Sequence, residues 1–101
     1  MNSGLTITDV KVRLVDSGTD GLIAWASCVI AGAIKLDNIA IRRGRDGSLF
    51  LTYPCKRTDA GEKYPYFNPI STEAAKAVED AVLARLAALA RAAAVAGAAG
   101  Q

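Results

Sequence analysis

Cationic side chains are the residues of this chain with the clearest chemistry, because they can bind anions. The segment 42–63 carries six cations against three anions, although the formal net charge of the whole chain is only +2. The cations expected on its turns are Arg42, Arg43, Arg45, Lys56 and Arg57, and Thr58 adds a hydroxyl donor. Such groups are typical of phosphate contacts. The same charges are also found on turns that are only solvated, so both interpretations stay open.

Residues that could catalyse a reaction are few. The chain has no histidine and contains no H-E-x-x-H, phosphate-loop, G-x-S-x-G or G-x-G-x-x-G motif. Four acids in predicted strands or turns could form a metal or acid–base site, although scattered surface carboxylates are far commoner: Asp9, Asp37, Asp59 and Glu62. We therefore expect a protein that is not an enzyme, with no metal, no other cofactor and no small-molecule substrate.

The compartment is indicated by the cysteines and by the start of the chain. Cys28 and Cys55 lack C-x-x-C spacing, which favours two free thiols in a reducing compartment. The first nine residues do not form the basic and apolar regions of a signal peptide. No apolar run reaches the ~18 residues that span a bilayer. We expect a cytoplasmic protein without membrane insertion.

Hydrophobic patterns predict four strands that would position the cations. Alternation over residues 9–14 indicates a half-buried strand. The apolar run 22–30 predicts a central strand, and residues 34–41 and 48–53 predict two more. In a regular strand the apolar side chains of Leu36 and Ile39 would point to opposite faces, which predicts a bulge near Asp37-Asn38.

The connections between these strands are short. They are predicted at residues 16–21, 31–32 and 42–47, and the last contains the hairpin signal Asp46-Gly47. Parallel strands need long crossovers, so the sheet is predicted to be an antiparallel meander. A further turn is predicted at 54–61. It leaves the far end of the fourth strand, so the two cation groups would lie about 20 Å apart unless the sheet curls or a partner intervenes.

The C-terminal part of the chain predicts one long amphipathic helix. Ser71 or Thr72 is a suitable N-cap, and residues 73–94 are rich in alanine without glycine or proline. An apolar stripe at helical spacing would pack on the sheet: Ala75, Val78, Val82, Leu86 and Leu89. The predicted fold is a small α+β domain over residues 1–94, followed by a flexible Ala/Gly tail at 95–101.

A second copy of the chain is predicted to contact the sheet. With 101 residues the chain is short for a stable core. Its central strands look apolar on both faces, whereas one helix covers only one face. A partner subunit could pair with an edge strand and extend the sheet. We therefore expect a sheet-mediated homodimer.

Several of these segments resemble the SpoVG family of small bacterial septation and sporulation regulators. The resemblance covers residues 5–86, and its most specific block runs from Leu49-Phe50 through Pro54 and Lys56-Arg57-Thr58 to Gly61. The other matching stretches are Ile7–Leu14, Ile39–Gly47, Pro69-Ile70 and Asp80–Leu83. The resemblance implies a small α+β domain that forms a homodimer and binds DNA and RNA as a regulator.

The resemblance also implies where nucleic acid is bound. In the family, contact is attributed to the start of the C-terminal helix and to nearby basic residues, which correspond here to residues 71–76. This chain departs from the family at two places. Only Lys76 retains the charge of a tract that is more basic in relatives, and Asn68 stands where relatives often have histidine. Glu73 places a carboxylate in the first helical turn, where it would repel phosphate.

The expected nucleic-acid site combines the turns with the helix start. Its candidate residues are Arg42, Arg43, Arg45, Lys56, Arg57, Thr58, Thr72 and Lys76. Tyr64, Tyr66 and Phe67 could stack on single-stranded bases, but packing under the helix is the favoured alternative. The expected function is a dimeric regulator of gene expression, septation or sporulation that acts on DNA, RNA or both. The alternative is a protein-interaction or scaffold module that affects cell division without binding nucleic acid.

Overall fold

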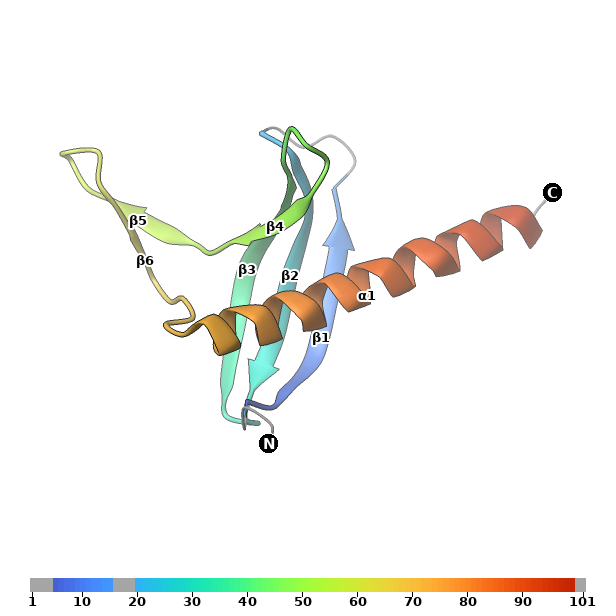
Figure 1. Ribbon diagram of the computed structural model, residues 1–101, viewed down its shortest axis with the longest axis horizontal. Coiled ribbons are helices and arrows are strands. Elements are labelled where there is room, and N and C mark those ends of the chain that lie inside the picture. The colour runs from blue at the N-terminus through green and yellow to red at the C-terminus, as the bar shows by residue number, and fades with distance from the viewer. Residues whose placement is uncertain (1–4, 16–19, 100–101) are drawn as a thin grey trace.

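A four-stranded antiparallel sheet and one long helix make up most of the structure. The computed structural model describes residues 5–15 and 20–99, with side chains up to residue 93. The sheet has the order β1 (Ile7–Leu14), β2 (Leu22–Ile30), β3 (Ile34–Arg43) and β4 (Leu49–Thr52) (Figure 1). A second, two-stranded sheet pairs β5 (Cys55–Arg57) with β6 (Lys63–Pro65), and α1 spans Thr72–Ala99. The predicted α+β meander with a C-terminal helix is confirmed.

The bulge predicted in the third strand is present in β3. Ala26 pairs with Ile39 and Cys28 pairs with Leu36, so Ser27 faces two residues of β3 instead of one. Asn38 takes up the extra residue at a φ of 58°. The bulge lets Leu36 and Ile39 both reach the helix side of the sheet, since both belong to the hydrophobic cluster around the helix.

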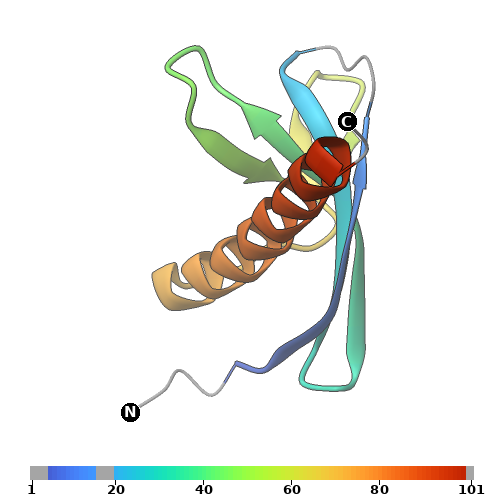
Figure 2. The same cartoon turned by 90° about the vertical axis from the view of Figure 1, so that its right-hand side faces the viewer.

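The helix covers one face of the sheet through its apolar stripe (Figure 2). The core joins Val78, Val82 and Leu86 of α1 to Ala24, Ala26, Cys28, Ile39 and Ile41 of the two central strands. The small residues of β2 leave room for the helix to approach the sheet. Cys28 is buried and serves as a small core residue, and this burial raises the pKa of its thiol. Cys55 is exposed.

Ser71 sets the start of the helix. Its side-chain Oγ accepts a hydrogen bond from the Ala74 N–H at 3.0 Å, and its carbonyl accepts one from the Ala75 N–H at 3.0 Å. Ser71 is therefore the N-cap, and Thr72 is the first helical residue. The helix continues to Ala99, five residues beyond its predicted end; the flexibility of the tail stays a prediction, and residues 100–101 lie outside the described chain. Within residues 5–15 and 20–99, no helix combines the length and hydropathy needed to cross a membrane.

Two predicted turns were wrong in extent. The turn predicted at 42–47 is shorter, because Arg42 and Arg43 pair with Phe50 and Leu49 as the last residues of β3. The turn predicted at 54–61 is instead the first half of a β-hairpin, with Lys56 opposite Tyr64. Of the turn predicted at 16–21, residues 16–19 lie outside the described chain.

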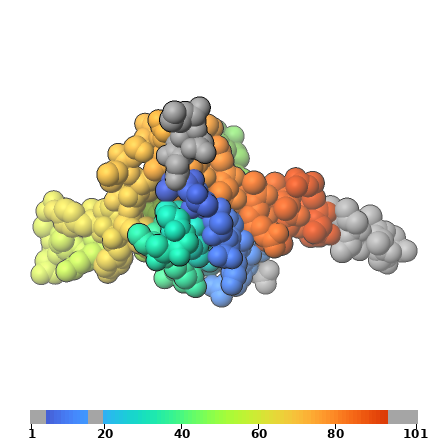
Figure 3. Space-filling model, turned by 90° about the horizontal axis from the view of Figure 1, so that it is seen from below, coloured from blue at the N-terminus to red at the C-terminus, as the bar shows by residue number. Residues whose placement is uncertain are grey.

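The β5–β6 hairpin projects away from the main sheet. Its base is closed by the Tyr66 N–H, which donates to the Pro54 carbonyl at 2.9 Å. Figure 3 shows the hairpin on one side of the molecule and the later part of α1 on the other. The radius of gyration is 15.2 Å, above the ~13 Å typical of a 100-residue domain, which reflects these two projections.

Candidate nucleic-acid interface

Lys56 and Arg57 lie on the projecting β5–β6 hairpin, where both are exposed. Thr58 organises the turn that follows them: its N–H donates to the Glu62 carbonyl at 2.9 Å, and its hydroxyl oxygen accepts from the Glu62 N–H at 3.2 Å. Gly61 completes the turn at a φ of 84°. These hydrogen bonds close the turn that follows the two cations of β5.

The hairpin has two faces of different composition. Directly opposite residues of a ladder share a face, and side chains alternate along each strand. Arg57 and Lys63 are paired, so they share one face with Cys55, whereas Lys56 and Tyr64 lie on the other. The Tyr64 hydroxyl donates to Glu62 Oε2 at 2.8 Å, and this hydrogen bond raises the pKa of Tyr64. The Arg57 face is therefore the more cationic of the two.

Arg42 extends this cationic face onto the main sheet. A hollow of ≈ 340 Å³ is lined by Arg42, Thr52 and Tyr53 of the sheet region, by Cys55 and Lys63 of the hairpin, and by Asp20. The Arg42 Nε donates to Thr52 Oγ1 at 3.1 Å, and its Nη1 donates to the Asp20 carbonyl at 3.2 Å. These contacts use two of the five guanidinium donors and hold the group in place.

Arg43 and Arg45 lie apart from Arg42. Because neighbouring residues of a strand point to opposite faces, Arg43 lies on the helix side, beside Leu49 and Leu83. Arg45 is exposed in the turn between β3 and β4. In that turn Asp46 Oδ1 accepts from both the Ser48 hydroxyl, at 2.7 Å, and the Ser48 N–H, at 3.0 Å, and these hydrogen bonds lower the pKa of Asp46.

The helix start is separated from Arg42 by the sheet. Thr72 and Lys76 belong to α1, which packs on the face opposite to Arg42. The Lys76 ammonium lies 3.3 Å from Asp80 Oδ2, one turn further along the helix. Both side chains are well exposed, so this ion pair is weak. The Asp80 carboxylate nevertheless offsets the positive charge of Lys76 at the start of α1. The predicted residues therefore form separate groups, not one patch.

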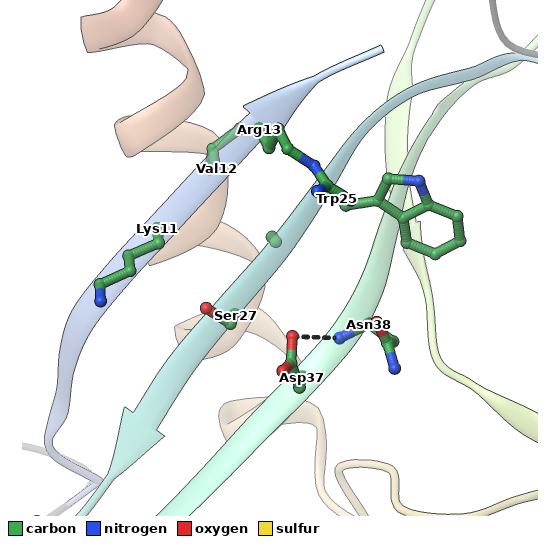
Figure 4. A pocket seen from close by; sticks show the side chains of 8 residues that line it. Lys11, Val12, Arg13, Trp25, Ser27, Asp37 and Asn38 are labelled. Carbon is green, nitrogen blue, oxygen red and sulfur yellow. Dashed lines mark hydrogen bonds between the residues drawn. The ribbon is translucent and has the colours of Figure 1, made fainter.

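The uncovered face of the sheet carries further candidates that sequence reasoning did not single out. Figure 4 shows Trp25 in the middle of this face, with Lys11 and Arg13 on the neighbouring strand β1. Arg13 is the direct β1 partner of Trp25, and Lys11 is paired with Ser27. The signal was present in the sequence, because Lys11 and Arg13 alternate with the apolar residues of their strand. Lys63 was likewise not among the candidates.

The aromatic residues after β5 have different environments. Phe67 packs edge-on against Tyr53, with ring centroids 5.8 Å apart, and borders the core. Tyr64 and Tyr66 are 51% and 69% exposed. The favoured prediction was that these rings pack under the helix. Phe67 packs at the border of the core, whereas the prediction is wrong for the exposed Tyr64 and Tyr66.

The predicted acids are dispersed. Asp9 and Asp37 lie in β1 and β3, whereas Asp59 and Glu62 lie in the hairpin loop. Within the described ranges, no group of three or more His, Cys, Asp or Glu residues is placed to hold a metal ion.

The family of the chain follows from comparison with known proteins. The SpoVG family model matches residues 5–88. This chain belongs to the SpoVG family. The match covers the sheet, the hairpin and α1 up to residue 88, so the resemblance noted from the sequence is confirmed.

Individual SpoVG proteins are similar over most of their length. One from Listeria monocytogenes serotype 4b, named "Putative septation protein SpoVG 1", is 37% identical over 81 residues, which cover 79% of this chain and 76% of the relative. One from Borreliella burgdorferi strain ZS7, named "Putative septation protein SpoVG", is 31% identical over 80 residues, which cover 77% and 81% respectively. A protein of the same name from Borrelia hermsii is also 31% identical over 80 residues.

Within the SpoVG domain, the candidates fall into three places. The hairpin carries Lys56, Arg57 and Thr58, the end of β3 and the following turn carry Arg42, Arg43 and Arg45 on different sides, and the helix start carries Thr72 and Lys76. The hairpin and Arg42 meet at one hollow, whereas the helix start lies across the sheet. The geometry therefore favours the hairpin with Arg42 as the centre of an anion-binding surface.

Proposed function

We propose that this SpoVG-family chain is a non-catalytic regulator that binds DNA or RNA as a homodimer in the cytoplasm and acts in septation, sporulation or gene expression. The observation that carries the proposal is the projecting hairpin, whose exposed Lys63 shares a hollow with Arg42, and whose Arg57, the β5 partner of Lys63, lies on the same hairpin face. Backbone phosphates are the ligands that such a set of cations fits. The septation names of the relatives support the cellular role.

Phosphate contact by the hairpin can be tested with charge removal. Replacing Lys56 and Arg57 by alanine should lower the affinity for DNA and RNA of any sequence by about three- to tenfold at low salt, because two counterion-releasing contacts are lost. The slope of log affinity against log salt should flatten by about one to two per protomer. Of the single variants, Arg57→Ala should have the larger effect, since Arg57 lies on the Arg42 side of the hairpin.

A matched control removes the same charge elsewhere. Arg85 and Arg91 are exposed on α1, so the Arg85→Ala/Arg91→Ala variant has the same net charge as the hairpin variant. Fluorescence anisotropy of a labelled oligonucleotide over a salt series measures both affinity and slope. Equal slopes for the two variants would remove the hairpin from the interface.

The homodimer has its own prediction. The structure exposes the edge strands β1 and β4, which a second copy could extend, and its radius of gyration exceeds that of a typical domain of this size. Sedimentation at micromolar protein should therefore give a species of twice the 10.5 kDa chain mass. A single 10.5 kDa species at that concentration would contradict the dimer.

A protein-interaction or scaffold role is the second candidate function. It is favoured by Tyr66 and Ile70, large hydrophobic residues that are 69% and 95% exposed between the hairpin and the helix. A protein partner could cover them without any contribution from the cations. In that case, affinity for nucleic acid would be absent or would not depend on the hairpin charges, so the same salt series separates the two functions.

A further inference from the structure

The sheet face opposite the helix has the composition of a binding surface. The helix covers the side formed by Ala24, Ala26 and the other small core residues, which leaves Trp25 on the other side. Trp25 is the single tryptophan of the chain. Figure 4 shows its indole extending from β2 across β3. Ala40, the β3 partner of Trp25, is only 3% exposed.

The indole borders two hollows of the open face. One of ≈ 360 Å³ lies between Trp25 and the side chains of Lys11, Arg13, Ser27 and Asp37. The other, of ≈ 390 Å³, lies between Trp25 and Arg42, Thr52 and Pro54. Trp25 is half-buried, with one hollow bordering it toward β1 and the other toward β4, and the linings of both hollows include cations.

The cations of this face are poorly balanced by acids. One carboxylate of this face, Asp37, accepts the Asn38 N–H at 2.8 Å and lies 3.9 Å from the Lys35 ammonium, and Asp20 lines the hollow beside Arg42. In contrast, Lys11, Arg13 and Arg42 form no ion pair with any residue in the described part of the chain. An anion arriving at Trp25 would therefore meet positive charge on both sides of the ring.

We propose that this open face binds a single-stranded nucleic acid, with Trp25 as a stacking platform for bases and Lys11, Arg13 and Arg42 as contacts for phosphates. The proposal rests on the proposed function, because it names the kind of nucleic acid and the surface that holds it. Exposed aromatic rings flanked by cations on a sheet are how many proteins bind single strands. The same cationic face continues through Arg42 to Lys63 and the hairpin.

The preference for a single strand over a duplex follows from the position of the Trp25 ring. Trp25 lies on β2, between β1 and β3 of the main sheet, and not on a projecting element that could enter a groove. Bases of a duplex are stacked on one another, so they cannot lie on such a ring without unpairing, whereas an unpaired base can.

A second copy of this chain fits the open face less well. A two-fold interface would place the same surface on both sides, so the face that carries Lys11, Arg13 and Arg42 would lie against an equally cationic face. Like charges opposite one another are destabilising. A strand partner at the sheet edge, as in the proposed dimer, leaves the open face uncovered.

The single tryptophan gives a direct readout in the unmodified protein. We would titrate it with a 15-nucleotide oligothymidine, with a duplex of the same length and with polyglutamate, following Trp25 emission and, for the labelled oligonucleotides, anisotropy. The expected result is saturable quenching by the single strand, with the dissociation constant given by anisotropy, and much weaker quenching by duplex or polyglutamate.

Four results would overturn the inference in different ways. Binding of oligothymidine without any change in Trp25 emission would support nucleic-acid binding but show that the open face is not the site. A second copy of the chain that covers the open face would lead to the same conclusion. Equal quenching by polyglutamate would assign the face to acidic protein segments. Absence of binding to single strand and duplex alike at low salt would refute the proposed function together with this inference.

Variants test the same surface independently. Lys11→Ala/Arg13→Ala should weaken oligothymidine binding about fivefold or more at low salt, whereas Arg85→Ala/Arg91→Ala, on the helix side, should weaken it less than twofold. Trp25→Leu keeps an apolar cover over Ala40 but removes the ring, and should weaken binding at least fivefold with little effect on duplex. Circular dichroism checks that each variant is folded. If Trp25→Leu unfolds, the Lys11→Ala/Arg13→Ala variant still tests the proposal. Unchanged affinity in the pair would contradict the proposal.

Discussion

Replacing Gly21 by alanine should lower the free energy of unfolding by about 3 kcal/mol or more. Gly21 has a φ of 77°, and a Cβ built on it would overlap the carbonyl oxygen of Arg43. The Gly21 carbonyl also accepts the Arg43 N–H at 2.8 Å. An alanine must therefore either strain the backbone or push the start of β2 away from the end of β3, and neither change is compensated elsewhere.

The measurement is urea or thermal unfolding followed by circular dichroism. A loss of this size should lower the melting temperature by roughly 12 °C or more for a domain of this length. Gly47 provides the matched control, because it has a φ of 87° but nothing lies within 4 Å of its Cβ position. Gly47→Ala should cost only about 1–2 kcal/mol, the strain of the left-handed backbone. Equal losses in the two variants would refute the close approach of Gly21 to Arg43.

If nucleic acid also contacts the start of α1, as the SpoVG resemblance implies, replacing Glu73 by arginine should raise the affinity for nucleic acid about three- to thirtyfold at low salt. Glu73 is exposed in the first turn of α1, two residues after the N-cap Ser71. A charge there is worth ~0.3–1 kcal/mol through the helix dipole alone, and the substitution reverses a repulsive charge. Helix stability should fall slightly, because a cation at the N-terminus opposes the dipole.

A control variant has the same change in net charge but carries it at a different position on the helix. Ala92 and Ala93 are exposed near the other end of the described helix, about 28 Å from Glu73 at 1.5 Å per residue. Ala92→Lys/Ala93→Lys adds the same two charges at that distance. Titration of one duplex at two salt concentrations compares the variants. If Glu73→Arg binds no better than this control, the helix start does not lie near the nucleic acid.

The main sheet and the helix could be predicted because their hydrophobic periods are clear. Eight of the nine residues of β2 are apolar, the opposite facing of Leu36 and Ile39 requires an extra residue, and the helical stripe contains Val78, Val82 and Leu86 as the buried positions. In each case the period of the sequence matches the face that is buried.

The hairpin could not be predicted in the same way. All three residues of β5 and all three of β6 are exposed, so no hydrophobic alternation marks them, and Pro54 and Pro65 look like turn residues. Their pairing is visible only in the register of Lys56 with Tyr64. The hollow that joins Arg42 to Lys63 depends on this pairing, which is why the sequence indicated cations but not their arrangement.

The open face was missed because of how the helix packs. A large aromatic residue within an apolar strand is usually expected in the core. Here the helix side of β2 is occupied by Ala24, Ala26 and Cys28, and Trp25 takes the opposite face. That choice depends on the close approach of the helix to β2, a tertiary feature that no local pattern encodes.

The most direct test of nucleic-acid binding is the salt dependence of wild-type affinity for random-sequence DNA and RNA oligonucleotides. Anisotropy titrations at a series of salt concentrations would be sufficient. We predict binding at low salt and a log–log slope of about −3 or steeper, since Arg42, Arg57 and Lys63 each release a counterion on contact with phosphate. Absence of binding at low salt, or an affinity that does not change with salt, would contradict the account and favour the scaffold role.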